Sequence, residues 1–319
     1  VQAWAKSGRR GSWRVGDIVP LLFAWMSGAP YAFVGTAKSE YYLRDEVGLL
    51  PRPTWFERME SWSGSVYLPW ERWLMTRSRC RAVFPRDSLT TQVLRQWPIP
   101  AFDLGNPMMD GLDLPVSAAQ FFGSEPERDG LTFVLLPGSR PPEAYQNWDR
   151  ILVAVQALID ARLEGRSLLF LAAIAPQLDL APLTAALIVQ GWRQTEQGFT
   201  QGKATIALSQ TNYRDCLYEA DFAIAMAGTA TEQFVGLGKP ALTIAGAGPQ
   251  FTPKFAEAQT RLLGASAILL KEPRQAPQIV RSILQDPDRL HLIAENGRRR
   301  LGASGAADRI AECLLDRLS

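Results

Sequence analysis

The feature that most constrains this chain is an alternation of short apolar runs and amphipathic helical patterns between residues 131 and 270. The run Leu131–Leu136 is apolar and ends at Pro137-Gly138, as in a strand buried on both faces of a parallel sheet. Further strands are predicted at 167–174, 205–208, 221–226, 240–244 and 267–270, and helices at 146–163, 179–190, 212–219, 229–237 and 253–263. This rhythm predicts an α/β fold with a doubly wound parallel sheet covered by helices on both faces.

The first part of the chain has a weaker version of the same pattern. Val15-Gly16 is predicted to form the tip of a strand. Further strands are predicted at 31–34, 81–84 and 101–104, and a helix at 20–25. Gly11–Arg14 is a poor strand pattern, and 45–75 reads as irregular. A complete domain of this type would begin with further βαβ-type units, roughly 60 residues in all. The N-terminal domain is therefore expected to be incomplete.

Clustered proline and glycine residues predict a linker within 107–130, and the stretch 277–318 reads as amphipathic helix. At 319 residues the chain suits two domains. We therefore expect an incomplete Rossmann-like domain over 1–115, a complete one over 116–290, and a helical tail over 291–319 that packs across both.

Histidine and cysteine usage excludes several classes of chemistry. His291 is the single histidine, which argues against histidine-based metal sites and Ser-His-Asp catalysis. The three cysteines (Cys80, Cys216 and Cys313) have neither metal-ligand spacing nor a disulfide pattern, which favours a reducing cytoplasm.

Charge and tryptophan are unevenly distributed. Residues 1–100 carry 14 Lys/Arg against 8 Asp/Glu, and seven of the ten tryptophans fall within residues 1–73. This favours an anionic or interfacial surface, with 49–81 at a bilayer and Arg72, Arg77, Arg79 and Arg81 near lipid phosphates. The alternative is ordinary surface arginine and core tryptophan. The uncharged run 18–37 is interrupted by Pro20, Gly28 and Pro30, so we interpret it as buried helix, turn and strand.

Two predicted strand ends carry residues suited to phosphate. Gly138, Ser139 and Arg140 combine close backbone approach, a hydroxyl donor and a guanidinium that can bind phosphate oxygens. The second segment, Gly228-Thr229-Ala230-Thr231, follows a strand and opens a helix, where free N–H groups attract an anion. Each alone could be only a turn or a helix cap. Together at one sheet edge they predict a diphosphate site.

These residues resemble a known family. Leu-Pro-Gly-Ser-Arg140 with Glu143, Ala-Gly-Thr-Ala-Thr231 with Lys239-Pro240, the segment Gly105–Asp110 and the tail Gly302–Ala311 look like lipid-A-disaccharide synthase, and most like the branch of lipid-A-disaccharide synthase-related proteins. The resemblance implies a GT-B fold of two Rossmann-like domains. It also implies a UDP-sugar donor of the N-acetylglucosamine class, a lipid-linked acceptor, and inverting transfer without a metal or other cofactor.

Carried over by motif, the resemblance assigns roles to individual residues. Ser139 and Arg140 would face the diphosphate, which the helix at Gly228 and Thr229 would cap. The family's ribose-binding glutamate falls on Gln233, with Glu232 one residue early. Asp17 resembles the catalytic aspartate, with the spacing off by one, and could equally cap a helix.

Other candidate residues rest on their positions after predicted strands. Gln250 could hydrogen-bond sugar hydroxyls, and Lys38, Ser39 and Glu40 could line the acceptor side, although both segments could be plain turns or loops. Asp286-Pro287-Asp288 has the D-x-D form of metal-dependent transferases but is better interpreted as a helix start.

The leading interpretation is thus a hexosyltransferase, cytoplasmic and peripheral to the inner membrane. A nucleotide-sugar epimerase and a non-catalytic nucleotide-sugar or lipid-binding relative are the alternatives. The single histidine argues against the epimerase. The one-residue differences from the family's motif spacing at Asp17 and Gln233 favour the non-catalytic relative. No stacking-platform motif accompanies the basic residues, which argues against nucleic acid.

Overall fold

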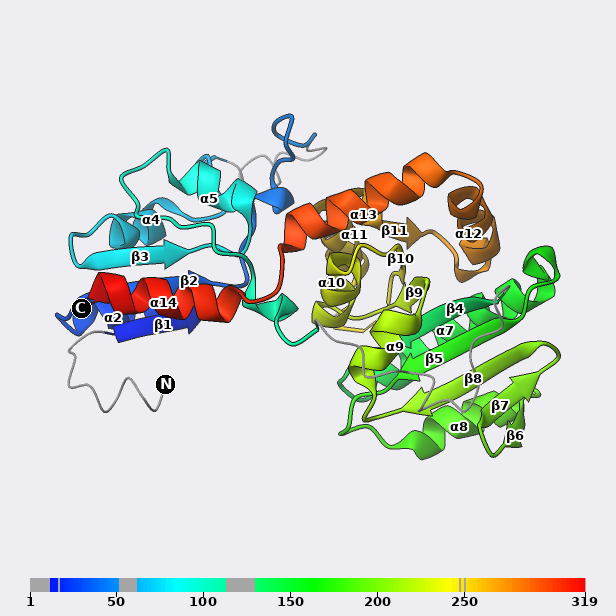
Figure 1. Ribbon diagram of the computed structural model, residues 1–319. Coiled ribbons are helices and arrows are strands. Elements are labelled where there is room, and N and C mark those ends of the chain that lie inside the picture. Colours follow the sequence, from blue (N-terminus) through cyan, green and yellow to red (C-terminus); the bar gives the residue numbers. More distant parts are fainter. Residues whose placement is uncertain are drawn as a thin grey trace. The chain divides into compact units, whose positions relative to one another are not determined.

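The computed structural model describes residues 12–16, 18–51, 62–112, 130–246, 248–249 and 251–318. The chain forms two compact units (Figure 1). Unit 1 comprises Val1–Gly111 and Arg300–Ser319, and unit 2 comprises Leu112–Arg299.

Unit 2 contains an eight-stranded sheet in the order β11-β10-β9-β4-β5-β8-β7-β6. The strands from β11 to β8 pair in parallel, and β7 and β6 add an antiparallel edge. The strands are β4 (Leu131–Leu136), β5 (Leu168–Ala173), β6 (Arg193–Thr195), β7 (Gly198–Gln201), β8 (Ala204–Ser209), β9 (Phe222–Ala225), β10 (Ala241–Ile244) and β11 (Ala267–Leu270). This confirms the predicted parallel α/β sheet.

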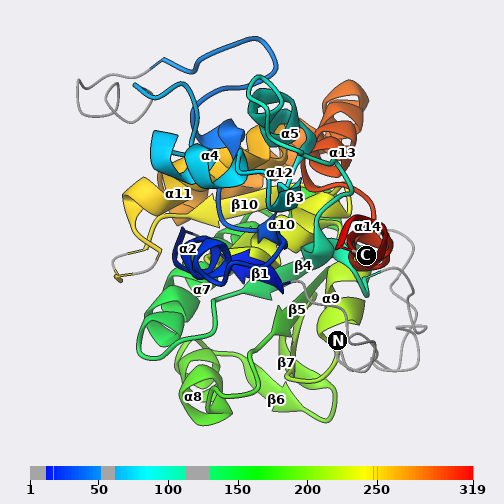
Figure 2. The same ribbon diagram turned by 90° about the vertical axis from the view of Figure 1, so that its left-hand side faces the viewer.

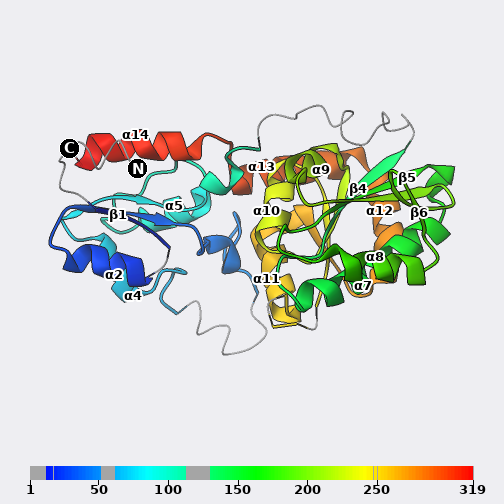
Figure 3. The ribbon, with the colours of Figure 1, turned by 90° about the horizontal axis from the view of Figure 1, so that it is seen from below.

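Helices cover both faces of this sheet, with α7 and α8 on one face and α9 on the other (Figure 3). The helices are α7 (Glu143–Asp160), α8 (Leu180–Val189), α9 (Tyr213–Glu219), α10 (Thr229–Gly236), α11 (Pro253–Leu263), α12 (Ala276–Leu284) and α13 (Pro287–Leu301). Short 3-10 turns lie at Leu163–Gly165, Gly264–Ser266 and Pro273–Gln275. The bounds of the strands and helices predicted between 131 and 270 agree with the structure to within three residues.

The β6–β7 hairpin was not predicted from the sequence. All three residues of β6 are exposed, so the strand has no apolar alternation to signal it. It forms because β7 pairs with the free edge of β8, a long-range contact that a local pattern cannot reveal.

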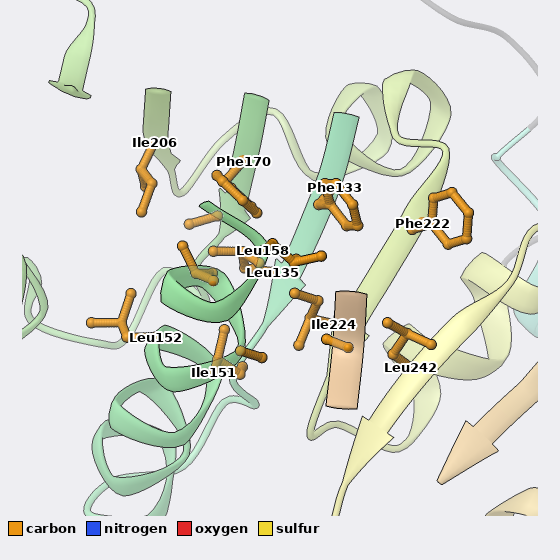
Figure 4. Close-up of a cluster of buried hydrophobic side chains, with 14 of the residues drawn as sticks. Phe133, Leu135, Ile151, Leu152, Leu158, Phe170, Ile206, Phe222, Ile224 and Leu242 are labelled. Carbon is orange, nitrogen blue, oxygen red and sulfur yellow. The ribbon is translucent and has the colours of Figure 1, made fainter. Parts of the chain in front are cut away.

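The core of unit 2 is built on three stacked phenylalanines from neighbouring strands (Figure 4). The Phe133 ring centroid lies 5.3 Å from that of Phe170 and 5.5 Å from that of Phe222. Ile151 and Leu158 of α7 belong to the same fully buried cluster. Apolar side chains at helical spacing on α7 thus meet the alternate side chains of β4, and this packing fixes the strand ends that carry the polar loops.

Unit 1 contains a three-stranded parallel sheet, β1-β2-β3. The strands are β1 (Ser12–Gly16), β2 (Tyr31–Gly35) and β3 (Cys80–Phe84), and the helices are α2 (Ile18–Met26), α4 (Pro69–Met75), α5 (Ser88–Leu94) and α14 (Ala306–Leu318). Short 3-10 turns lie at Glu40–Tyr42 and Pro107–Met109. Figure 2 shows α2 and α4 as neighbours, and the Trp25 and Trp73 rings meet edge to face at 5.6 Å between centroids.

Two strand predictions in unit 1 are wrong. The stretch dismissed as a poor strand contributes Ser12–Arg14 to β1, which pairs with Tyr31–Phe33 of the buried strand β2. Conversely, the strand predicted at 101–104 is reduced to a single bridge between Ala101 and Val83. In both places pairing with a neighbouring strand, not local composition, decides the outcome.

The C-terminal segment contributes to both units. In unit 2, Asn296 of α13 donates from Nδ2 to Leu263 O at 2.6 Å and to Ser266 Oγ at 2.8 Å. In unit 1, Ile310 of α14 packs against the sheet residues Val34 and Phe84.

The start of α14 is fixed by charge. The Asp110 carboxylate accepts hydrogen bonds from the N–H groups of Ala306 at 2.9 Å and Ala307 at 2.7 Å, a favourable position for a negative charge. The predicted Gly105–Asp110 segment therefore anchors the closing helix of unit 1.

Candidate functional site

The two predicted phosphate loops leave neighbouring strands at the same edge of the unit 2 sheet. β4 and β9 pair in parallel with Leu136 opposite Ala225, and Met226 N donates to Leu136 O at 2.9 Å. A cavity of about 670 Å³ opens beyond these strand ends. Both segments line it, from Pro137 to Arg140 and from Ala227 to Ala230. The register of β4 and β9 thus brings together residues separated by some ninety positions.

Gly138 allows the two loops to approach closely. Its φ is +98°, which favours glycine, and an added Cβ would lie 3.3 Å from Met226 O. A side chain at this position would therefore push against the backbone that leads into α10.

The N-terminus of α10 points its unbonded amides toward the cavity edge. Gly228 is the N-cap, and its carbonyl accepts from Thr231 N at 3.1 Å and Glu232 N at 3.2 Å. The N–H groups of Thr229 and Ala230 come before the first hydrogen-bonded residues of the helix, and they therefore have no acceptor within it. Thr231 is buried and donates from Oγ1 to Ala227 O at 2.6 Å, which makes it a support of the loop.

Ser139 and Arg140 lie exposed at the cavity rim. Gln177 donates from Nε2 to Ser139 O at 2.9 Å and so holds the loop from the β5 side. Within the part of the chain that the structure describes, the Arg140 guanidinium has no hydrogen-bond or ion-pair partner. An exposed cation and free helix N–H groups line the same cavity, and both suit an anionic ligand.

Gln233 and Glu232, the two candidates for the ribose position, differ in placement. Gln233 lines the cavity, and Tyr213 donates from its hydroxyl to Gln233 Oε1 at 2.6 Å. Burial raises the pKa of Tyr213, so this hydroxyl remains a donor over the ordinary pH range. Glu232 is buried, at 7 % exposed, and is not among the cavity-lining residues.

Two buried polar residues of α7, Glu143 and Asn147, also line the cavity. From the sequence, Glu143 was identified only as a motif position, and Asn147 was not predicted as a site residue. A detectable signal existed, because both residues share a helix face with the buried Ile151, where polar side chains are expensive unless hydrogen-bonded.

Lys239 of the family-like Lys-Pro pair is a structural residue. Its ammonium donates to Leu217 O and Tyr218 O near the end of α9, and burial lowers its pKa to about 8. It does not line the cavity.

The candidate acceptor-side residues of unit 1 are held in internal contacts. Lys38 forms an ion pair with Glu71 at 2.6 Å. Ser39 and Glu40 are completely buried, and the Glu40 carboxylate is paired with Arg44 at 3.0 Å. Their role toward an acceptor stays a prediction. The predicted catalytic residue Asp17 and the predicted sugar contact Gln250 lie outside the described residues.

Arg72 does not occupy the predicted lipid-facing position. It is only 7 % exposed, and its guanidinium stacks 3.9 Å from the Trp97 ring centroid and donates to Ser63 O at 2.8 Å. The periodicity of α4 turns this arginine inward, where the indole covers its charge.

Neither a metal cluster nor a membrane-spanning helix is found in the residues that the structure describes. No group of three His, Cys, Asp or Glu side chains there could hold a metal ion. Asp286 accepts from Arg289 N at 3.0 Å, as expected for a residue at a helix start. None of the helices in these ranges is long and apolar enough to cross a membrane.

Comparison with solved structures defines the fold class. The chain is similar to a putative UDP-N-acetylglucosamine 2-epimerase from Listeria monocytogenes, with 15% identity and a TM-score of 0.57 over 98% of this chain and 76% of that one. It is also similar to the Neisseria meningitidis UDP-GlcNAc 2-epimerase bound to UDP-GlcNAc, with 15% identity and a TM-score of 0.56 over 95% of this chain and 76% of that one.

Acinetobacter baumannii MurG is a third similar structure, with 14% identity and a TM-score of 0.54 over 99% of this chain and 76% of that one. Neither a protein-family model nor a curated protein sequence matches the chain. The similar structures have the GT-B fold, which confirms the predicted fold class.

The close approach at Gly138 gives a stability prediction. Gly138→Ala should lower the free energy of unfolding by more than the roughly 1–2 kcal/mol expected for a left-handed residue alone, because the new Cβ also contacts Met226 O. Gly202→Ala is the matched control, since Gly202 has a φ of +61° and open space around it. Urea unfolding of both variants should rank Gly138→Ala as the more damaging; equal losses would contradict the inferred contact.

Proposed function

We propose that this protein is a glycosyltransferase that binds a UDP-sugar of the N-acetylglucosamine class in the unit 2 cavity. The observation that carries the proposal is the convergence of the Gly138 loop, the N-terminus of α10 and the Arg140 guanidinium at one sheet edge. A diphosphate carries the negative charge and oxygen acceptors that these groups are suited to bind.

The cavity extends to both sides of the proposed diphosphate position. On one side lie the ends of β5 and β8 with Tyr213 and Gln233, which we assign to the nucleoside. On the other side lie Phe251 and Phe255, which we assign to the sugar. The Neisseria structure, bound to UDP-GlcNAc, is consistent with a ligand of this class on this fold.

The proposed reaction is a direct, inverting displacement. An acceptor hydroxyl attacks the anomeric carbon, the bond from that carbon to the diphosphate breaks, and UDP leaves with the electron pair. Arg140 and the α10 amides would stabilise the charge on the leaving diphosphate. A base must take the hydroxyl proton, and Asp17 is the proposed base. No step in this scheme requires a metal or another cofactor.

Epimerisation of a nucleotide sugar is the second candidate, because the similar structures include the Neisseria UDP-GlcNAc 2-epimerase. The position of His291 favours transfer instead. This single histidine lies on α13 with its side chain 75% exposed, interacts with Glu295 at 3.3 Å, and does not line the cavity. Histidine chemistry is thus not available at the proposed donor site.

A lipid-linked acceptor of the lipid-A-disaccharide synthase type is the proposed second substrate, and an exposed apolar face of unit 1 supports it. Phe23 and Met26 of α2 are 59% and 63% exposed, and Trp70 and Trp73 of the adjoining α4 are 52% and 46% exposed. Neighbouring apolar and aromatic side chains at a helix surface are typical of an interfacial contact.

Basic residues adjoin this α2–α4 face. The Arg77 guanidinium stacks 4.3 Å from the Trp73 ring centroid, and Arg79 lies beside Gly28 at the end of α2. Apolar side chains with arginines at their edge match an anionic bilayer surface. We therefore propose that the protein is cytoplasmic and peripheral to the inner membrane, with this face against the lipid.

The donor assignment is tested by calorimetric titration with UDP. The wild-type chain should bind UDP, and Arg140→Ala should weaken binding by about 1.5–3 kcal/mol, the range for a hydrogen bond to a charged group. Because Arg140 is exposed, the variant should unfold at the wild-type urea concentration. A wild-type chain that does not bind UDP would refute the proposal.

The membrane assignment is tested by co-sedimentation with vesicles that contain phosphatidylglycerol. Phe23→Ser combined with Trp70→Ser should lower vesicle binding by about tenfold or more, because two exposed apolar side chains are lost. Ile188→Ser combined with Val189→Ser, which alters two exposed apolar residues of α8 in unit 2, should leave it unchanged. Equal effects of the two pairs would contradict the assignment.

A further inference from the structure

Two buried polar side chains on one face of α7 connect the loops around the cavity. Glu143 and Asn147 are four residues apart, and they are 6% and 2% exposed. Asn147 donates from Nδ2 to Pro137 O at 3.0 Å and to Met226 O at 3.4 Å, so it links the β4 and β9 loops. Buried polar groups are retained only when hydrogen-bonded, and both of these Asn147 bonds go to loop backbone.

Glu143 holds the third loop, which connects β10 to α11. Its Oε1 accepts a hydrogen bond from Phe251 N at 2.7 Å. Gly248 passes so close that an added Cβ would lie 2.5 Å from the Glu143 carboxyl carbon. Gly246 N donates to Phe251 O at 2.8 Å and closes the loop on itself. The carboxylate thus occupies a space that only a glycine at position 248 leaves open.

The residues that Glu143 positions form the aromatic wall of the cavity. Phe251 and Phe255 both line it, with ring centroids 5.4 Å apart in an edge-to-face contact. Phe255 reaches the start of α10, because its Cζ would lie 3.6 Å from a Cβ built on Gly228. A group attached to a phosphate bound at α10 therefore lies next to this wall.

We propose that Glu143 is a positioning residue for the sugar of the donor, acting by fixing Gly248 and Phe251 and with them the Phe251–Phe255 wall. This inference rests on the proposed function, since it requires a UDP-sugar in the cavity. The wall offers apolar ring surface to the C–H groups of a hexosamine and to its acetamido methyl. The nucleoside and the diphosphate are assigned to other strand ends, and neither is assigned a contact with Gly248 or Phe251.

A comparison of UDP binding with UDP-N-acetylglucosamine binding distinguishes a role at the sugar position from a general effect on the cavity. Glu143→Ala should weaken binding of UDP-N-acetylglucosamine about tenfold or more, as for loss of a hydrogen bond to a charged group. Binding of UDP alone should change less than about twofold, which is the spread for sites that share no partner. A role in folding alone would lower thermal stability without changing the ratio of the two affinities.

Three further variants sharpen the test. Glu143→Gln keeps an acceptor oxygen for Phe251 N and should retain the wild-type ratio. Gly248→Ala should reproduce the loss, since its backbone lies outside the left-handed region and the three atoms nearest to an added Cβ all belong to Glu143. Combined with Glu143→Ala, it should add little further. Gln146→Ala, exposed on the same helix, is the matched control and should have no effect.

Calorimetric titrations with both ligands decide the outcome. If wild type binds both ligands and Glu143→Ala retains the wild-type ratio of the two affinities, the positioning role is overturned. A change in that ratio in Glu143→Gln would also overturn it, because the carboxylate would then act through its charge. A wild-type chain that binds neither ligand would instead refute the proposed function.

Discussion

The parallel pairing of β4 with β9 is the interaction on which the candidate site depends. With Leu136 opposite Ala225, both strands end at the same level of the sheet, and their loops enter the cavity side by side. A shift of one residue would turn each side chain to the opposite face and separate the glycine loop from the helix N-terminus. The stacked rings of Phe133 and Phe222 lie on these same two strands and oppose such a shift.

Unit 2 maintains this geometry with hydrogen bonds from buried side chains to loop backbone. Asn147 and Gln259 approach the loops from different helices, and Gln259 donates from Nε2 to Ala227 O at 3.1 Å and to Gly228 O at 3.2 Å. Each such group would be costly in the core without a partner. Their bonds therefore stabilise a preformed cavity, and preformed sites lose less free energy when they order around a ligand.

The sequence predicted what local patterns determine. Uniformly apolar runs such as Leu131–Leu136 identify buried parallel strands, and Gly138 and Gly228 mark the loops that follow them. It could not reveal contacts that depend on distant partners. Strand β1 exists because Ser12–Gly16 pairs with β2, and the role of Glu143 depends on Gly248, more than a hundred residues away.

The direction in which a side chain points was a second feature that could not be predicted from the sequence. A count of basic residues could not distinguish Arg72, which stacks inward on Trp97, from Arg77, which stacks on the partly exposed Trp73. Similarly, the adjacent positions Glu232 and Gln233 were separated only once α10 was seen to turn the first inward and the second toward the cavity.

The central claim is that a diphosphate binds between the Gly138 loop and the start of α10. Amide hydrogen exchange with and without UDP tests it most directly, because the free N–H groups of this edge would become hydrogen-bond donors to phosphate. Slower exchange in the segments 138–140 and 228–231, with little change in the β6–β7 hairpin, is the predicted result. Unchanged exchange in both segments under saturating UDP would contradict the account.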